Sequence, residues 1–209
     1  MAASPPERVR GVVLAGGRST RFGEENKALA RLDGRPVVAH VVETVAEATD
    51  GTPVLSVATD SQAEQLCGAL GRPVETVRDG VGRSGPLAGL AAAAEAVDAP
   101  WLFVCACDMP LVTPESVDAL CARAAAVDGD CELDAVVPVV DGYDQPLHAL
   151  YRRSAFGPAL DSLSEDGAMM ALLDRLTVER FAAAETDAPL GAATTNVNTR
   201  ADLAALRDD

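Results

Sequence analysis

The chain has 209 residues, of which 48% are hydrophobic and 23% are charged, and this composition predicts a folded chain with a buried core. Its formal net charge of −15 argues against a protein that binds nucleic acid or an anionic membrane surface, because such binding needs clustered basic residues. Sixteen of the 17 basic residues are Arg and the other is Lys27, and an acidic composition with so little lysine favours a halophilic protein.

The sequence contains no feature of a membrane or secreted protein. No apolar run approaches the roughly 18 residues that a membrane span requires, and the first eight residues hold no hydrophobic segment of signal-peptide length. The five cysteines are odd in number and form no CxxC pair, so a disulfide framework is not expected. We therefore predict a cytoplasmic protein.

Short β-branched runs alternate with Ala-rich stretches over the first 140 residues. Helices are predicted at 36–49, 62–70, 87–97 and 114–127, the last with Thr113 as N-cap and Pro114 in its first turn. Nearly continuous apolar strands separated by helices indicate an α/β fold with a mostly parallel sheet covered on both faces. The predicted strands are 10–15, 53–58, 74–78, 101–105 and 134–140.

No repeat or linker divides the chain, so we predict a single domain. After about residue 141 the alternation weakens, which suggests a lid or an acceptor-binding segment built onto the sheet. Residues 201–209 are predicted to form a solvated helix. Open parallel sheets bind ligands beyond the carboxyl ends of their strands, so the residues that follow each strand are the first candidates for a site.

The loop after the first predicted strand is rich in glycine and in positive charge. Gly16 and Gly17 let backbone amides approach a ligand closely, and Arg18, Arg21 and Lys27 add positive charge. These features favour a polyanion such as a nucleoside triphosphate, and the alternative is a glycine-rich connection with solvated arginines. The spacing fits neither a Walker loop nor a dinucleotide fingerprint, so hydride transfer with a nicotinamide cofactor loses its main support.

Two carboxylates stand where predicted strands end. Asp108 follows the fourth strand and is predicted to hold Mg²⁺, which binds one or two carboxylates together with substrate phosphate oxygens. Asp79 follows the third strand at an equivalent position. Either residue could instead serve in a turn or a helix cap, and position alone does not decide between these roles. The segment SGPLAGL at 84–90 then begins a helix whose first amides can face an anion.

The two histidines receive different predictions. By pattern His148 is the more exposed of the two, and it belongs either to an acceptor site or to a strand in which neighbours hydrogen-bond it. His40 lies in a predicted helix and is expected to be structural. No GxSxG nucleophile motif accompanies either residue, so hydrolysis by a catalytic triad is not supported.

Five motifs together carry a resemblance to a known family: LAGGRSTRFG with NKAL, RDG with GPLAGL, CDMP, QPLHALY, and NVNTRADL. In this order and approximate spacing, from about residue 12 to residue 206, the chain resembles the molybdenum cofactor guanylyltransferases, a branch of the MobA-like nucleotidyltransferases. The resemblance implies a Rossmann-like three-layer sandwich of nucleotidyltransferase type. It also implies a nucleotide-binding half at about 10–110 and an acceptor-binding half at about 111–209.

The implied reaction is Mg²⁺-dependent transfer of GMP from GTP to the phosphate of molybdopterin, with release of pyrophosphate. Two alternatives keep the chemistry, namely transfer from CTP and transfer to another phosphorylated acceptor such as cobinamide phosphate. A third alternative is a nucleotide-binding partner of a molybdoenzyme that has no activity of its own. The partners implied are GTP, molybdopterin, and the proteins that deliver molybdopterin or receive the finished cofactor, with the chain as a monomer or weak oligomer.

The resemblance also assigns roles to single residues. Lys27 is implied to contact phosphate, Asp108 to bind both Mg²⁺ and nucleotide, and Arg21 is expected to assist catalysis. The full set implied to bind the nucleotide is Leu14, Ala15, Gly16, Gly17, Lys27, Asp79 and Asp108. The set implied to face the acceptor is Gln145, Pro146, His148, Asn196 and Asn198.

The sequence departs from the family pattern in two places. Asn26 stands where the family usually has Asp before the loop lysine, and an amide would order Lys27 more weakly than an ion pair. No asparagine follows the second predicted strand, where the chain has Ala58, Thr59 and Asp60. The contact to the nucleotide base is therefore not predicted from the sequence.

Overall fold

The computed structural model describes residues 8–17, 26–80, 83–127, 133–164 and 167–208, and an eight-stranded sheet forms its centre. The strands run in the order β10-β7-β9-β6-β1-β4-β5, and β8 pairs with β7. Pairing is parallel except where β9 meets β6 and β7 and where β8 meets β7. The bounds are β1 (Val9–Leu14), β4 (Val54–Val57), β5 (Thr76–Arg78), β6 (Trp101–Ala106), β7 (Ala135–Val140), β8 (Tyr143–Asp144), β9 (His148–Arg152) and β10 (Val178–Ala182).

The half of the sheet built from β1, β4, β5 and β6 follows the sequence prediction to within one or two residues at each strand end. β1 pairs with β6 on one side and with β4 on the other, and β5 pairs with β4 as the edge strand. Every side chain of β4 and β6 is buried. Helices cover both faces of these strands, which explains why their sequences are apolar without alternation.

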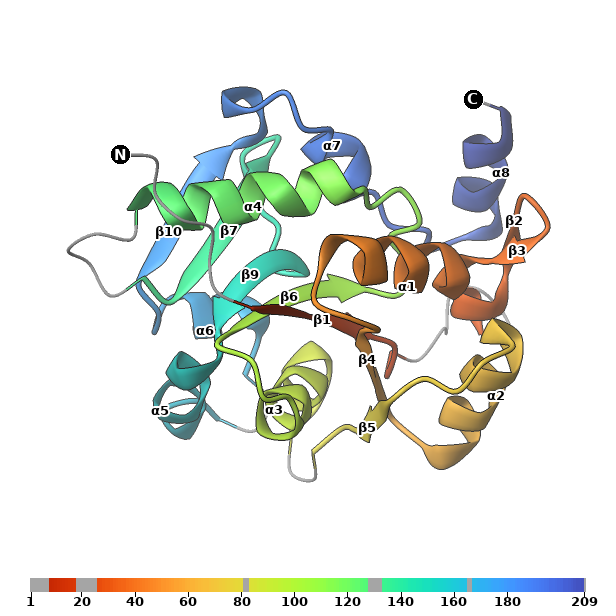
Figure 1. Ribbon diagram of the computed structural model, residues 1–209, viewed down its shortest axis with the longest axis horizontal. Helices are drawn as coiled ribbons and strands as arrows, with labels where there is room; N and C mark the ends of the chain where they lie inside the picture. The colour runs from red at the N-terminus through yellow and green to blue at the C-terminus, as the bar shows by residue number, and fades with distance from the viewer. Residues whose placement is uncertain (1–7, 18–25, 81–82, 128–132, 165–166, 209) are drawn as a thin grey trace.

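Helices form a layer on each face of the sheet, so the predicted three-layer sandwich is confirmed (Figure 1). One layer contains α1 (Val37–Ala48) and α4 (Pro114–Val127), and α2 (Asp60–Leu70) adds Leu66 to the same core. The other contains α3 (Pro86–Ala96), α5 (Phe156–Asp161) and α6 (Met169–Leu173). Thr113 caps α4 as predicted, because its hydroxyl accepts the Ser116 N–H at 3.2 Å.

The region after residue 141 differs from the prediction. Rather than forming a lid on the sheet, β9 enters it between β6 and β7 and runs antiparallel to both. Four of its five side chains, from His148 to Tyr151, are buried. A five-residue strand that begins with His and ends with Arg shows little strand character in sequence, and only the neighbouring strands reveal its central place.

The C-terminal helix forms where the sequence predicted it and most of its described residues are exposed, but one of its side chains is buried. α8 (Arg200–Asp208) packs beside the hairpin of β2 (Arg31–Leu32) and β3 (Arg35–Pro36), as Figure 1 shows. Leu203 is only 7% exposed and shares a small core with Leu32 and Val197. A single turn of apolar contact is enough to attach the helix, and this is too short a pattern to read from an otherwise polar sequence.

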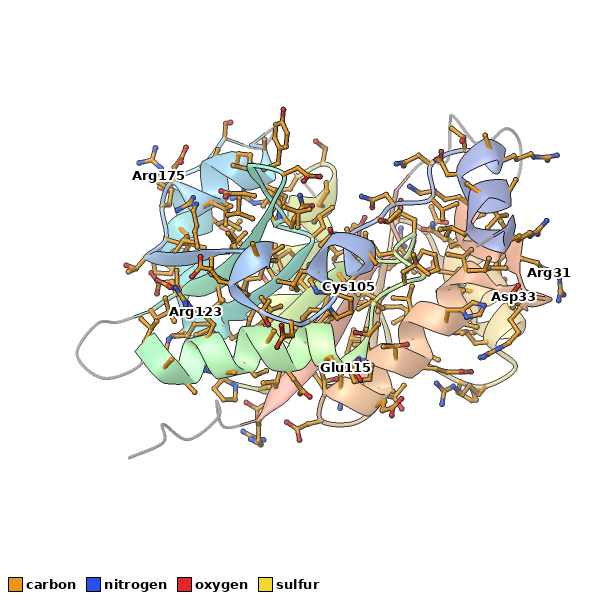
Figure 2. All side chains as sticks on the ribbon, turned by 90° about the horizontal axis from the view of Figure 1, so that it is seen from above. Arg31, Asp33, Cys105, Glu115, Arg123 and Arg175 are labelled. Carbon is orange, nitrogen blue, oxygen red and sulfur yellow. The ribbon has the colours of Figure 1, made fainter. Side chains whose placement is uncertain are left out.

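The remaining elements are short: the 3-10 helices η1 (Lys27–Leu29), η2 (Arg153–Ala155) and η3 (Ala183–Glu185), and α7 (Leu190–Ala193). Figure 2 shows Arg31 and Asp33 of the β2–β3 hairpin at one end of the molecule and Arg175 at the other. Within the described ranges, no helix is long and apolar enough to cross a membrane. The described cysteines, Cys67, Cys105, Cys107 and Cys121, are all free thiols, as predicted.

Candidate active site

A cavity of about 340 Å³ opens at the carboxyl ends of β1, β4, β5 and β6. This is the edge of a parallel sheet at which ligands are expected. Five loops that are far apart in sequence meet there. The cavity is lined by Leu14, Ala15, Gly16, Gly17, Asn26, Lys27, Ser56, Asp79, Gly85, Pro86, Gly89, Ala106, Cys107, Asp108, Leu147, Asn196 and Asn198.

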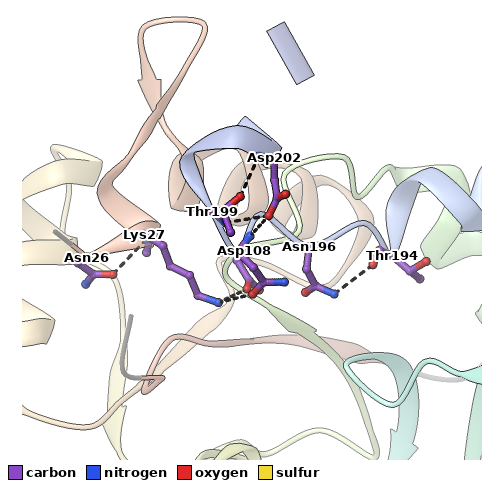
Figure 3. Close-up of polar contacts among 9 residues, drawn as sticks. Asn26, Lys27, Asp108, Thr194, Asn196, Thr199 and Asp202 are labelled. Carbon is purple, nitrogen blue, oxygen red and sulfur yellow. Dashed lines mark hydrogen bonds and ion pairs between the residues drawn. The ribbon is translucent and has the colours of Figure 1, made fainter. Parts of the chain in front are cut away.

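Lys27 and Asp108 form an ion pair in this cavity. The Lys27 ammonium donates to the Asp108 carboxylate, and it also lies 3.3 Å from the Asn198 Oδ1 atom. Asp108 is 5% exposed and comes directly after the central strand β6. Because a buried carboxylate is costly without a cation, this pair fixes both charges at one end of the cavity (Figure 3).

Asn26 orders the backbone of Lys27 rather than its ammonium. The Asn26 side chain accepts the Ala28 N–H at 3.1 Å and so caps the 3-10 helix that begins at Lys27. An asparagine serves this capping role as well as an aspartate does. The amide at position 26 therefore keeps a structural task, and Asp108 supplies the negative charge beside the lysine.

The segment from Asn196 to Asn198 reaches the cavity from the C-terminal part of the chain. Its anchor is the Val197 N–H, which donates to the backbone carbonyl of Asp108 at 2.8 Å. The Asn198 N–H in turn donates at 2.8 Å to the carboxylate of Asp202 in α8. The backbone N–H groups of Asn198 and Thr199 lower the pKa of Asp202. Helix α8 thus helps to hold Asn198 beside Lys27.

Asp79 lines a different part of the same cavity. Its backbone N–H donates to the Val57 carbonyl at 2.9 Å, and its carboxylate accepts the hydroxyl of the buried Ser56. A Cβ atom at Gly16 would collide with the Asp79 carboxylate, and one at Gly89 would collide with the Ser56 hydroxyl. Both positions must therefore be glycine for the carboxylate to keep its place.

Two residues of this region escaped the sequence analysis. Ser56 is a polar residue within the apolar run 53–58, and that interruption was the available signal. Gln62 joins two loops, because its Nε2 donates to the Ala15 carbonyl at 2.5 Å and its Oε1 accepts the Ala58 N–H at 2.9 Å. Nothing in the sequence distinguishes Gln62 from a surface residue of α2.

Residues 145–148 contribute Leu147 to the cavity lining, and Gln145, Pro146 and His148 are not among the lining residues. The prediction that His148 is the more exposed histidine is wrong, because its exposure is 0% and His40 is only half-buried. His148 stacks edge-on against Phe103 at 5.2 Å between ring centroids. Inward-facing positions of a central strand are buried whatever their polarity.

Burial lowers the pKa of His148 to about 4, partly opposed by the nearby backbone of Ser116. Neither ring nitrogen of His148 has a hydrogen-bond partner in the part of the chain that the structure describes. The imidazole is therefore neutral at physiological pH. It can influence the site through the packing of β9 against β6.

The donor groups near Asp108 suit a magnesium ion. Mg²⁺ uses one or two carboxylates and completes its shell with water and substrate phosphate oxygens, so it does not require a dense protein cluster. The described residues contain no group of three or more His, Cys, Asp or Glu that could hold a metal. Burial, and then the charge of Asp108, raise the pKa of the neighbouring Cys107 thiol to about 12.

The structure brings together most of the residues that the sequence singled out for the nucleotide. Leu14, Ala15, Gly16, Gly17, Lys27, Asp79 and Asp108 all line the cavity, as do Asn196 and Asn198 from the acceptor set. Arg21 lies outside the described residues. The combination of amides, a paired cation and a buried carboxylate is suited to binding a phosphorylated ligand.

Comparison with known proteins identifies the family. Residues 11–181 match the MobA-like NTP transferase domain. A relative from Natronomonas pharaonis named "probable molybdenum cofactor guanylyltransferase" is 33% identical over 84% of this chain and 86% of its own, and one of the same name from Bacillus mycoides is 32% identical over 95% and 96%.

A solved structure supports the same assignment. The molybdopterin-guanine dinucleotide biosynthesis protein A of Archaeoglobus fulgidus superposes with a TM-score of 0.77 at 27% identity, covering 95% of this chain and 97% of that one. Sequence and fold therefore agree over nearly the whole chain. The protein belongs to the MobA-like nucleotidyltransferase family, in the branch of the molybdenum cofactor guanylyltransferases.

Proposed function

We propose that the enzyme transfers GMP from GTP to the terminal phosphate of molybdopterin and releases pyrophosphate, with Mg²⁺ as its metal. An oxygen of the molybdopterin phosphate attacks the α-phosphorus of GTP and forms the new P–O bond. The bond from the α-phosphorus to the oxygen that bridges it to the β-phosphate breaks, and pyrophosphate leaves with that electron pair. The relatives named guanylyltransferases support this choice of reaction.

The residues of the chain position the groups and neutralise charge. The amides of Gly16 and Gly17 hold phosphate oxygens, and the Lys27 ammonium balances the negative charge that grows on the leaving pyrophosphate. Asp108, Asn196 and Asn198 line the cavity and would hold the metal through their side-chain oxygens. When bound, Mg²⁺ offsets charge on the phosphate groups.

The observation that carries the proposal is the ion pair between Lys27 and Asp108 at the phosphate end of the cavity. Lys27 is the one lysine of the chain, and all the other basic residues are arginines. The chain thus keeps a compact ammonium, and not a guanidinium, beside the buried carboxylate of Asp108. A compact ammonium can turn from this carboxylate to a phosphate oxygen, and a metal ion can take its place beside Asp108. The pair is thus suited to a site that binds nucleotide and metal together.

The acceptor side is proposed from the same geometry. Asn196 and Asn198 line the cavity, and the Asn198 Oδ1 atom lies 3.3 Å from the Lys27 ammonium, so we assign these two residues to the phosphate of molybdopterin. We extend the proposal to Gln145 and Pro146, which flank the lining residue Leu147. We assign His148 an indirect role, because it packs in β9 against Phe103 of β6 and does not line the cavity. Proteins that deliver molybdopterin and that receive the finished cofactor are the partners this function requires.

The test is pyrophosphate release with GTP, CTP, ATP and UTP in turn, with molybdopterin as acceptor, with and without Mg²⁺. The assay contains high KCl because the acidic composition predicts a salt-tolerant protein. We expect release with GTP and Mg²⁺ only. In Lys27→Ala and Asp108→Ala we expect the rate to fall by about 10²–10³, the usual cost of one group that stabilises transition-state charge.

A matched control is Asp118→Ala, which removes an exposed carboxylate from α4 outside the cavity lining and should leave the rate unchanged. Pyrophosphate release with CTP in place of GTP contradicts guanylyl transfer and indicates the same nucleotidyl-transfer reaction with a different nucleotide. GTP binding without release from any nucleotide contradicts the enzymatic proposal with this acceptor.

A further inference from the structure

Gln62, in the first turn of α2, contacts two loops at the ligand edge of the sheet. Its Nε2 atom donates to the Ala15 carbonyl at 2.5 Å, and its Oε1 atom accepts the Ala58 N–H at 2.9 Å. Ala15 begins the glycine-rich loop that follows β1, and Ala58 directly follows β4. The side chain therefore ties the start of the glycine-rich loop to the end of the neighbouring strand.

The contact with Ala58 is a form of helix capping. Thr59 is the N-cap of α2, and its hydroxyl accepts the Gln62 N–H at 3.2 Å. Gln or Glu at this third helical position commonly returns a side-chain oxygen to the backbone before the helix, and either residue can do so because only an acceptor is needed. The contact with Ala15 needs a donor instead, which glutamine has and an ionised glutamate lacks.

The contact with Ala15 sets the direction of the peptide unit that joins Ala15 to Gly16. In a trans peptide unit the C=O and N–H groups point in opposite directions, and the described residues contain no cis peptide. The Ala15 N–H is already held by the Ser56 carbonyl at 2.8 Å, so Gln62 fixes the other end of this residue. The Gly16 N–H therefore points away from Gln62 and α2.

The direction away from α2 is the direction of the cavity. α2 packs in one helical layer, whereas α3 in the opposite layer supplies Pro86 and Gly89 to the cavity lining. Gly16 lines the cavity and Gln62 does not. Within the described ranges, the structure records no acceptor for the Gly16 N–H. The geometry thus leaves this donor for a ligand in the cavity.

We infer that Gln62 is a positioning residue that aims the Gly16 N–H at a phosphate oxygen of the bound nucleotide. It acts through the Ala15 carbonyl and lies outside the cavity lining. A peptide N–H that is fixed before the ligand arrives stabilises an anion without a cost of reorganisation. The inference rests on the phosphate contact proposed for Gly16 and adds the residue that orients it.

The experiment measures binding of GTP and of guanosine by calorimetry, with Mg²⁺ and high KCl and without acceptor. The main variant is Gln62→Glu, which keeps an oxygen for the Ala58 N–H and loses the donor to Ala15. We expect its midpoint of urea unfolding to stay close to the wild-type value, because α2 remains capped. Its affinity for GTP should fall about 10- to 100-fold, because one hydrogen bond to a charged phosphate is lost, and its affinity for guanosine should not change.

Two further variants separate charge from position. Gln62→Met is neutral and of similar length, and it should weaken GTP binding about tenfold and also lower the urea midpoint, because both hydrogen bonds are lost. Ser61→Glu adds a negative charge at the neighbouring exposed position of α2 and should change neither quantity, since high KCl screens exposed charges. A GTP affinity that falls equally in Ser61→Glu and Gln62→Glu overturns the inference.

A purely structural role for Gln62 gives different results. If Gln62 supports the cavity as a whole, Gln62→Glu weakens GTP and guanosine by the same factor, and that result overturns the inference. Wild-type protein that binds GTP no more tightly than guanosine also overturns it, because the loop then holds no phosphate. Because no acceptor is present, a failure of transfer to molybdopterin contradicts only the proposed function. Transfer with undiminished GTP affinity in Gln62→Glu contradicts only the inference.

Discussion

Asp108 and Asp79 hold comparable positions in the fold and have different surroundings. Each follows a parallel strand at the same edge of the sheet, and each receives one hydrogen bond that the structure records from a neighbouring side chain. Asp108 extends from the central strand β6 and pairs with an ammonium, whereas Asp79 extends from the edge strand β5 and pairs with a hydroxyl. The comparison teaches that two carboxylates at equivalent strand ends differ in local charge balance, because one has a cationic partner and the other a neutral one.

The largest effect is expected from a substitution that fills the space beside the Asp79 carboxylate. In Gly16→Ala the new methyl group collides with the Asp79 carboxylate, so either the loop or the carboxylate must shift. We expect destabilisation of about 1–3 kcal/mol, typical of overpacking, and GTP binding weakened more than tenfold. Urea unfolding and a GTP titration measure the two effects.

Gly17→Ala is the matched control, because a Cβ there meets no atom within 4 Å. It should change stability by less than about 0.5 kcal/mol, as a substitution in open space does. Equal effects of the two substitutions would show that the loop needs glycine for its backbone conformation and that the space beside Asp79 is not the reason.

The strand that carries Asp108 depends on the neutral, buried His148 of β9. The pKa of His148 is about 4 in the folded protein against 6.5 for the free side chain, so the unfolded chain binds the proton more strongly. Stability contributed by neutral His148 is therefore complete above pH 6.5 and declines as the pH falls toward 4. Between pH 7.5 and 5.5 the loss should be about 1 kcal/mol by urea unfolding.

His148→Leu should remove this part of the pH dependence, because no titrating group then stands at the position. His40→Gln should retain it, because it leaves His148 intact. A wild-type protein whose stability is constant from pH 7.5 to 5.5 would contradict the account of His148 as a buried neutral residue.

The smallest expected effect tests whether α8 holds Asn198 beside Lys27 and Asp108. Asp202→Ala removes the carboxylate that accepts the N–H groups of Asn198 and Thr199, and it should lower turnover by less than the loss expected in Lys27→Ala. Asp202→Asn keeps an acceptor oxygen and should be closer to wild type. Measurement of kcat and KM for both variants decides the point, and unchanged kinetics in Asp202→Ala would mean that Asn198 is held without α8.

The sequence alone predicted the α/β class, the parallel half of the sheet and most of the loop residues that line the cavity at its edge. Periodic apolar runs specify such strands locally, and Asp79 and Asp108 stand where those runs end. The glycine-rich loop with the one lysine also predicted a polyanion site before any packing was known. Each of these features depends on the residues of one short segment, so the sequence of that segment is enough to predict it.

The tertiary structure decided the features that depend on segments far apart in the chain. Only pairing with β6 and β7 places the five-residue β9 inside the sheet and buries His148. The contacts of Val197 with Asp108 and of Asn198 with Asp202 bring Asn198 to Lys27, across 171 residues of sequence. The role of Ser56 as the hydrogen-bond donor to Asp79 is visible only in the folded protein. In the sequence, a hydroxyl in an apolar strand gives no indication of the residue that will accept its hydrogen bond.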